Sequence, residues 1–198
     1  MHTVLLATSN LHKLDEFRAI FSDLPVKLVS LNDIHLDIEV EETGSTFAEN
    51  AELKARIYAH ISQMVALADD SGLEIDALNG APGVYSARYL GNETSYQERF
   101  RVILEHMKDL PPEKRSARFR CVIALADPSG TIKSVEGVVE GAIADHPRGS
   151  HGFGYDPIFL LPELGKTFAE LEPEYKNRIS HRARAARLAH KLLEDWPV

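Results

Sequence analysis

The sequence predicts an α/β fold in which helices flank a mixed central β-sheet. In the first half, short apolar runs alternate with segments whose apolar residues recur at helical spacing. In the middle, two extended runs are separated by the turn sequence Asp127–Gly130, which indicates a hairpin. Alternation favours parallel strands and a hairpin adds antiparallel ones, so we expect a mixed sheet. With 198 residues, of which 44% are hydrophobic, the chain can bury a substantial core.

The first elements are predicted to be a strand, a helix and a second strand. Val4–Ala7 is an apolar run that ends in the polar residues 8–10, and Val26–Val29 is another apolar run. The helix between them is predicted from apolar residues at helical spacing, namely Leu14, Phe17, Ile20 and Phe21.

Two helices in the middle of the chain are predicted from capping sequences. Thr46–Glu49 has the form of a capping box and precedes apolar residues at helical intervals. This helix leads to residues 65–68, which we predict to be a short buried strand. Ser95–Glu98 can cap a further helix that extends to about Met107.

The last part of the chain predicts a hairpin, a strand and a helix. Residues 117–122 alternate between polar and apolar, and Ile132–Glu140 resumes the extended pattern, so the two runs form the hairpin. Pro157–Leu161 predicts a further strand, and Ser180–Glu194 predicts a final helix. Because we find neither a long linker nor a repeat, residues 1–198 are predicted to be one domain, with any lobes inside one folded unit.

Composition argues against several classes of protein. Thirty acidic residues outnumber 22 basic ones, and a net charge of −8 is unlike that of proteins that bind nucleic-acid polymers. No apolar run is long enough to span a membrane, and the N-terminus lacks the basic start of a signal peptide. The one cysteine, Cys121, excludes an internal disulfide and is expected to be buried. We therefore expect a cytoplasmic protein.

Charge is distributed unevenly along the chain. Residues 37–52 carry six acids and no Lys or Arg, whereas residues 176–191 carry six bases and no Asp or Glu. The two segments could be solvated surfaces, or they could be a divalent-cation site and a phosphate site. An enzyme that acts on a metal-bound nucleotide needs both kinds of site, but charge alone does not choose between the two readings.

Two motifs follow predicted strands. Thr8–Lys13 lies at a junction of strand and helix, where backbone N–H groups and a lysine favour an anion, although a plain helix cap explains the same residues. Asp69–Gly72 offers two carboxylates that suit Mg²⁺ or the activation of water. The alternative for the second motif is a turn whose aspartates cap the next segment.

Two further motifs lie in the second half of the chain. Gly149–Pro157 combines three glycines, which permit close approach of the backbone to a ligand, with two aromatic rings that could stack on a planar base. Its alternative is a flexible loop whose rings cover the core. Lys176–Arg182 places His181 and Arg182 at the start of the final helix, where positive side chains oppose the helix dipole and are easier to explain if a ligand binds there. The alternative is a solvated, arginine-rich helix face.

The ordered set of motifs resembles the inosine triphosphate pyrophosphatases, in particular the bacterial dITP/XTP type. The matching segments run nearly from end to end: Ala7–Asn10 with Lys13, Glu41–Gly44, Thr46–Ala51 with Leu53–Ala55, Ala68–Leu73, Ala81–Tyr89, Phe119 with Cys121, Gly152–Pro157 with Phe159, Lys166–Thr167, and Ser180–Arg182 after Lys176. The specificity comes from the set and its order. Two positions depart from the pattern, because Ser9 and His151 stand where the family usually has glycine.

The resemblance implies an enzyme that hydrolyses ITP, dITP and XTP to the nucleoside monophosphate and pyrophosphate. Such an enzyme removes deaminated purines from the nucleotide pool. The resemblance also implies Mg²⁺ as the cofactor, a homodimer, and an elongated fold of two lobes with the nucleotide in a cleft between them.

The resemblance implies roles for individual residues as well. Asp70 would activate the water and would bind Mg²⁺ together with Glu41, with Asp69 as a supporting acid. Three lysines and several neutral donors would hold the triphosphate, namely Lys13, Lys54, Lys176, Thr8, Ser9, Asn10 and Ser71. The base would be bound by the run Phe153, Gly154, Tyr155 and Asp156, in which Phe153 stacks, and by His181 and Arg182, which donate to the 6-keto oxygen.

Two other functions stay open at this point. Maf-like enzymes share the broad fold and act on modified or pyrimidine nucleotides, but Gly152–Asp156 and Ser180–Arg182 argue against them. A nucleotide-binding regulator without turnover would not need the pair Asp69–Asp70 together with the lysines. A panel of nucleotides distinguishes the three readings.

Overall fold

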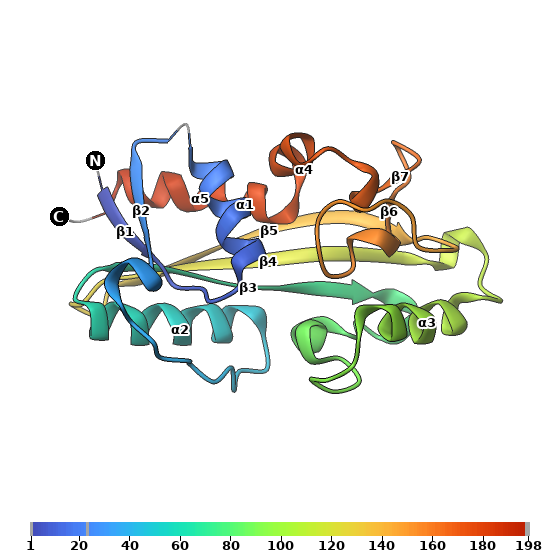
Figure 1. Cartoon of the computed structure of the whole chain (residues 1–198), viewed down its shortest axis with the longest axis horizontal. Helices are drawn as coiled ribbons and strands as arrows, with labels where there is room; N and C mark the ends of the chain where they lie inside the picture. Colours follow the sequence, from blue (N-terminus) through green and yellow to red (C-terminus); the bar gives the residue numbers. More distant parts are fainter. Residues whose placement is uncertain (1, 23, 197–198) are drawn as a thin grey trace. The chain divides into compact units, whose positions relative to one another are not determined.

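The structure is a computed structural model that describes residues 2–22 and 24–196. Within these residues, seven strands form one sheet in the order β2-β1-β3-β4-β5-β6-β7 (Figure 1). The strands are β1 (His2–Leu6), β2 (Val26–Ser30), β3 (Val65–Ile75), β4 (Ser116–Ala126), β5 (Ile132–Ile143), β6 (Phe159–Leu161) and β7 (Lys166–Thr167). Strand β1 is parallel to β2 and β3, whereas β6 is antiparallel to β5 and β7. The predicted α/β class with a mixed sheet is confirmed.

Several helices begin at the capping residues that the sequence contains. The Thr46 side chain and Glu49 form the predicted capping box, and Ser95 accepts a hydrogen bond from the backbone of Glu98. The helices are α1 (Leu11–Phe21), α2 (Phe47–Ser62), α3 (Tyr96–Met107), α4 (Pro173–Ile179) and α5 (His181–Glu194). Among residues 2–22 and 24–196, no helix has the length and apolar character needed to cross a membrane.

Some elements differ from the sequence-based expectations. Helix α4 (Pro173–Ile179) and strand β7 (Lys166–Thr167) were not predicted. Strand β3 continues to Ile75, so the strand predicted at residues 65–68 was too short, and the alternative of a turn at Asp69–Gly72 is wrong. The two aspartates remain in a buried strand because side chains from distant parts of the chain offset their charges. Strand β6 begins only at Phe159, because Asp156–Ile158 forms a 3₁₀ turn that contains Pro157, a residue without the N–H group that a sheet ladder uses.

The chain divides into two compact units. Unit 1 comprises Met1–Asp70, Cys121–Gly137 and His181–Val198, and unit 2 comprises Ser71–Arg120 and Val138–Ser180. Strands β3, β4 and β5 each contribute residues to both units. The assignment of residues 1–198 to a single domain stays a prediction.

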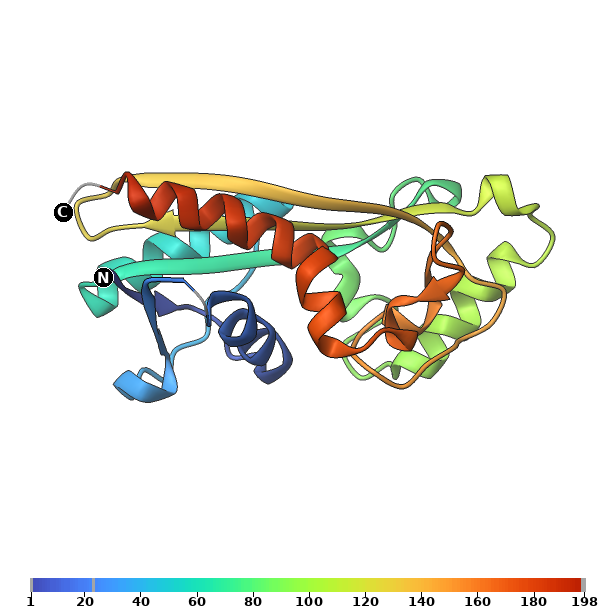
Figure 2. The same cartoon turned by 90° about the horizontal axis from the view of Figure 1, so that it is seen from above.

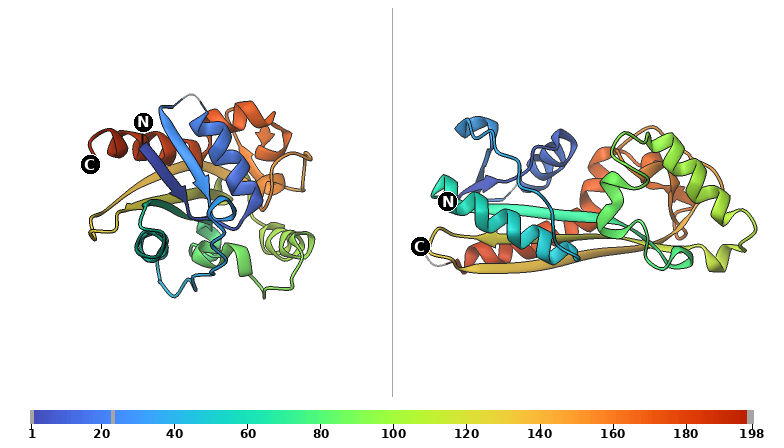
Figure 3. Two further views of the ribbon diagram at one scale, coloured as in Figure 1. Left: turned by 60° about the vertical axis from the view of Figure 1, so that its left-hand side comes forward. Right: turned by 90° about the horizontal axis from the view of Figure 1, so that it is seen from below.

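Helices cover both faces of the sheet in unit 1. Helices α1 and α5 lie on one side and contact each other, and α2 lies on the other side (Figures 1 and 3). The core includes Leu6, Phe17 and Cys121, which is buried as expected. Helix α5 runs along β5 (Figure 2), and Gly137 of β5 permits this approach, because a Cβ atom there would lie 2.2 Å from the backbone oxygen of His181.

An aromatic cluster forms the core of unit 2. Phe119 of β4 lies with its ring centroid 4.5 Å from that of Phe159 and 5.7 Å from that of Phe168. Helix α3 adds Phe100 and Ile103 to the same cluster. These large rings bury much apolar area, and the core that they form supports the loop Gly149–Pro157.

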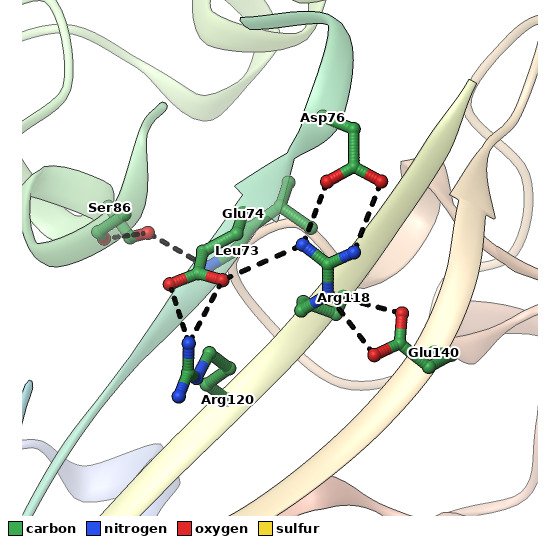
Figure 4. Close-up of polar contacts among 8 residues, drawn as sticks. Leu73, Glu74, Asp76, Ser86, Arg118, Arg120 and Glu140 are labelled. Carbon is green, nitrogen blue, oxygen red and sulfur yellow. Dashed lines mark hydrogen bonds and ion pairs between the residues drawn. The ribbon is translucent and has the colours of Figure 1, made fainter. Parts of the chain in front are cut away.

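A network of charged side chains crosses β3, β4 and β5 in unit 2 (Figure 4). Arg118 of β4 lies between two acids, with Nη1 2.8 Å from Asp76 Oδ1 and Nε 3.1 Å from Glu140 Oε1. Two residues further along the strand, Arg120 pairs with Glu74 at 3.4 Å. Side chains two residues apart in a strand share a face, so the network links the three strands on one partly exposed face of the sheet.

Candidate active site

The turn between β1 and α1 uses its polar side chains for its own hydrogen bonds. Asn10 caps α1, because its Oδ1 accepts the Lys13 N–H at 3.2 Å, and Thr8 Oγ1 accepts the Asn10 N–H at 3.2 Å. Ser9 is exposed at the centre of the turn. The turn therefore presents Lys13 from a fixed helix start, and the Lys13 ammonium lies 2.9 Å from Asp69 Oδ2.

Asp69 is the centre of a buried cluster of charges in unit 1. Besides Lys13, the guanidinium of Arg182 lies 3.5 Å from the same carboxylate oxygen, and the thiol of Cys121 donates to it at 3.9 Å. Burial works against ionisation of Asp69, but Lys13, Arg182 and Lys54 together hold its pKa well below the usual range. Asp69 is thus a permanent negative charge that neutralises and orients these cations.

Arg182, which was predicted to read the base, lies in this cluster. Its side chain is 2% exposed, and Nη1 lies 2.5 Å from Glu16 Oε2. The acids Glu16 and Asp69 raise the pKa of the guanidinium although burial opposes them. His181 precedes it at the start of α5 and is also buried. Glu16 was missed by the sequence analysis, although it lies one helical turn after Lys13 on α1.

Asp70 occupies a second environment beside Asp69. Its Oδ2 accepts a hydrogen bond of 2.9 Å from Nδ2 of Asn50, which lies on α2. Burial raises the pKa of Asp70 to about 6, the Glu42 carboxylate adds to this effect, and Lys54 opposes it. Adjacent positions of one strand therefore hold one carboxyl that is always ionised and one whose pKa lies near neutral pH. A pKa in this range is expected of a group that transfers protons.

Lys54 connects the acidic segment, residues 37–52, to strand β3. Its ammonium pairs with the Glu42 carboxylate and also donates to the backbone oxygen of Asp69 at 2.6 Å. Glu41, the predicted metal ligand, is exposed, whereas its neighbour Glu42 is the acid that contacts Lys54 and whose charge raises the pKa of Asp70. In the part of the chain that the structure describes, no three His, Cys, Asp or Glu side chains are gathered as a ready-made metal site.

The glycine-containing loop of unit 2 is ordered around Asp156. This carboxylate lies 2.5 Å from the Lys176 ammonium, and it accepts the backbone N–H of Phe153 at 2.9 Å. Gly152 has a positive φ of 73°, and a Cβ atom there would lie 2.0 Å from Asp156 Oδ2, so only glycine fits without a shift of the carboxylate. The loop therefore holds Phe153 through its backbone.

The other members of this loop have different surroundings. Lys176 is 3% exposed, with its ammonium 5.1 Å from the centre of the Phe153 ring and 5.8 Å from that of Phe168. Tyr155 is a core residue whose hydroxyl donates to the backbone oxygen of Ser86 at 2.9 Å. Gly154 has a positive φ of 61°, which suits a residue without a Cβ atom. The buried pair of Lys176 and Asp156 accounts for the shape of the loop.

The predicted residues are divided between the two units. Unit 1 holds Thr8, Ser9, Asn10, Lys13, Glu41, Lys54, Asp69, Asp70, His181 and Arg182, and unit 2 holds Ser71, Phe153, Gly154, Tyr155, Asp156 and Lys176. Within unit 1, the structure brings Lys13, Asp69 and Arg182 together and brings Lys54 to Asp69. Within unit 2, it brings Lys176 to Asp156 and Phe153.

The chain is similar to known proteins along nearly its whole length. The model of the Ham1 family matches residues 4–192. The chain is 47% identical over 194 residues to a dITP/XTP pyrophosphatase of Bacillus subtilis (strain 168), with 98% of each chain covered. It is 50% identical over 188 residues to a dITP/XTP pyrophosphatase of Geobacter sulfurreducens, with 95% of this chain and 94% of the relative covered.

A solved structure of similar fold is known as well. The chain aligns with a HAM1 protein from Coxiella burnetii at a TM-score of 0.88 and 44% identity, covering 99% of this chain and 100% of that one. The family relationship inferred from the motifs is confirmed, and the chain belongs to the Ham1 family.

Proposed function

We propose that this chain is a Mg²⁺-dependent nucleoside triphosphate pyrophosphatase that converts ITP, dITP and XTP to the monophosphate and pyrophosphate. Membership of the Ham1 family and the names of the relatives support this activity. The observation that carries it is the pair of unlike carboxyls at Asp69 and Asp70: Asp69 lies against Lys13 and Arg182, whereas Asp70 lies against the Asn50 amide, and burial raises its pKa. Its cellular role is the removal of deaminated purines from the nucleotide pool.

Asp70 is assigned to the activation of water. The water oxygen forms a bond to the α-phosphorus, the bond from that phosphorus to the bridging oxygen of the β-phosphate breaks, and the proton of the water passes to Asp70. A base whose pKa lies slightly below the working pH is ionised yet still takes up a proton well. Burial and Glu42 give Asp70 this property.

The carboxylates of Asp70, Glu41 and Glu42 have the chemistry that Mg²⁺ requires. This ion is held by one or two carboxylates together with water and substrate phosphates, so a full cage of protein ligands is not needed. Asp70 and a carboxylate of the segment Glu41–Glu42 would hold it, and the repulsion between Asp70 and Glu42 is the kind of interaction that a cation relieves. When bound, Mg²⁺ offsets the charge of the phosphates and of the leaving pyrophosphate.

The triphosphate is assigned to basic residues that lie next to these acids. Lys13 and Lys54 each lie against an acid, at Asp69 and Glu42 respectively, so their ammonium groups are held in place before substrate binds. The hydroxyl groups of Thr8 and Ser9 and the side-chain amide of Asn10, together with Ser71, add neutral donors. Lys176 is assigned to the substrate as well, and its contact with Phe153 links it to the loop that is proposed to bind the base.

Recognition of the base is assigned to Phe153, His181 and Arg182. Phe153 stacks on the purine, and His181 and Arg182 donate to its 6-keto oxygen. Adenine carries an amino group at that position, so donors would face donors. A site of this kind discriminates by a factor of roughly 10⁴ or more, because buried polar groups are left without partners when the wrong base binds.

Product analysis tests the proposed activity. The purified chain is incubated with ITP and Mg²⁺, and the products are identified by ³¹P NMR. We expect IMP and pyrophosphate, with no reaction in excess EDTA. IDP and inorganic phosphate, or no product at all, would contradict the proposal. The proposed homodimer and cytoplasmic location are tested separately, by light scattering and by fractionation of cells.

A further inference from the structure

Asn50 is a buried polar residue that the mechanism above does not use. It lies on the first turn of α2, is 0% exposed, and uses both ends of its amide. Nδ2 donates to Asp70 Oδ2 at 2.9 Å, and Oδ1 accepts the backbone N–H of Gly44 at 2.7 Å. A buried amide is costly unless its hydrogen bonds are made, so this arrangement serves the two partners that it joins.

The contact with Asn50 leaves no room for a side chain at position 44. A Cβ atom at position 44 would lie 2.7 Å from Asn50 Oδ1 and 2.7 Å from the Cβ of Glu49. Any other residue would therefore displace the amide or the chain around it. Gly44 follows Glu42 by two residues, so Asn50 joins the acidic segment directly to the reactive carboxyl of β3.

Helix α2 makes a second link between the same two segments. Lys54 lies four residues after Asn50, and residues at this spacing share a helix face. Lys54 contacts the Glu42 carboxylate and the backbone oxygen of Asp69, whereas Asn50 contacts Gly44 and Asp70. The capping box of Thr46 and Glu49 fixes the start of the helix next to both contacts. One helix face thus sets the position of the acidic segment against β3 at two points.

We propose that Asn50 is a positioning residue, which orients the Asp70 carboxylate and fixes its place relative to the acidic segment. This inference rests on the proposed role of Asp70 in activating water. An amide suits this task because it donates to a carboxylate without neutralising it, whereas an acid at position 50 would place a like charge beside Asp70. Removing such an outer partner commonly costs 10-fold to 100-fold in activity or metal affinity.

The test compares Asn50→Ala with Tyr58→Phe. Tyr58 lies on the same helix, four residues after Lys54, and donates to the backbone oxygen of Ile38 at 2.6 Å. Its variant therefore also removes a hydrogen bond between α2 and the acidic segment, but one that does not reach Asp70. We expect Asn50→Ala to lower kcat for ITP about 10-fold to 100-fold, with KM changed less than about 3-fold, and Tyr58→Phe to retain kcat. The assays are done well below the melting temperature, with folding checked by circular dichroism.

A readout apart from turnover is the affinity for Mg²⁺ alone, measured by calorimetry, which should weaken in Asn50→Ala but not in Tyr58→Phe. If Asn50→Ala does not fold, Gly44→Ala takes its place, because its methyl group displaces the Asn50 amide, and the same loss of kcat is expected. A folded variant with wild-type kcat and wild-type Mg²⁺ affinity would overturn the inference.

Exchanging the side chains of Asn50 and Asp70 distinguishes a role of Asn50 in positioning Asp70 from a role in packing alone. The double variant Asn50→Asp with Asp70→Asn restores one amide and one carboxylate at hydrogen-bond distance. We expect it to recover the melting temperature lost in Asn50→Asp but not turnover, because the carboxylate is now on the helix. Recovered turnover would contradict the inference. A wild-type chain without activity would instead refute the proposed function, so the two failures can be told apart.

Discussion

Replacing Asp70 with Asn is expected to stabilise the metal-free protein while abolishing turnover. Burial and the charge of the Glu42 carboxylate raise the pKa of Asp70 from 3.8 to about 6. The folded protein therefore holds this acid in its ionised form at a cost in stability. Asparagine has nearly the same shape, carries no charge, and can still accept the hydrogen bond from Asn50.

The magnitude follows from the proton affinities of the folded and unfolded states. A rise in pKa from 3.8 to about 6 corresponds to about 3 kcal/mol, at about 1.4 kcal/mol for each tenfold change in affinity. Because the folded state has the higher pKa, the cost is absent below pH 3.8, grows as the pH rises, and is complete above about pH 6. Asp70→Asn should thus gain about 3 kcal/mol near pH 7.5 but only about 1 kcal/mol near pH 4.5.

Urea unfolding in EDTA at the two pH values measures this gain. Asp69→Asn is the matched control, since it is the neighbouring buried acid in the same strand. Its removal leaves Lys13 and Arg182 without their shared counter-charge, so we expect a loss of about 3–5 kcal/mol instead of a gain. The reasoning is refuted if Asp70→Asn is no more stable than the wild type near pH 7.5, or if its gain does not depend on pH.

Three further predictions concern other charged side chains. Glu42→Gln should weaken activation by Mg²⁺ more than Glu41→Gln, because the charge of Glu42 acts on Asp70 and Glu41 is exposed. An Mg²⁺ titration of pyrophosphate release ranks the two variants, and the reverse order would contradict this assignment. Lys176→Met should cost about 3–5 kcal/mol in stability by leaving Asp156 buried without its partner, as thermal unfolding would show; an unchanged melting temperature would exclude this. Arg118→Met in the partly exposed network should cost about 1 kcal/mol or less, in a salt-dependent manner, and should leave turnover unchanged.

Local patterns were sufficient to predict most elements of the fold. The capping box at Thr46 and the cap at Ser95 gave the starts of α2 and α3, because such caps act within one helical turn. The length of β3 could not be predicted in this way. Asp69–Gly72 reads as a turn in isolation, and what keeps it extended is contributed by Lys13, Asn50 and Lys54, which lie on other elements.

The candidate site was predictable as a set of motifs but not as a set of contacts. The sequence indicated Asp69 and Arg182 separately, whereas their contact, and that of Arg182 with Glu16, depends on how α1, β3 and α5 pack. Asn50 was overlooked, although its spacing of four residues before Lys54 placed both side chains on one helix face. An asparagine inside a predicted helix, where its propensity is low, was the available signal.

The release of pyrophosphate from a panel of nucleotides tests the central claim most directly. The wild-type chain and Asp70→Asn are assayed with ITP, dITP, XTP, GTP, ATP and dTTP, in Mg²⁺ and in excess EDTA. We expect rapid release from the first three substrates only, with Mg²⁺ and with Asp70 intact. Preferred turnover of dTTP, binding of ITP without release, or full activity of Asp70→Asn would contradict the account.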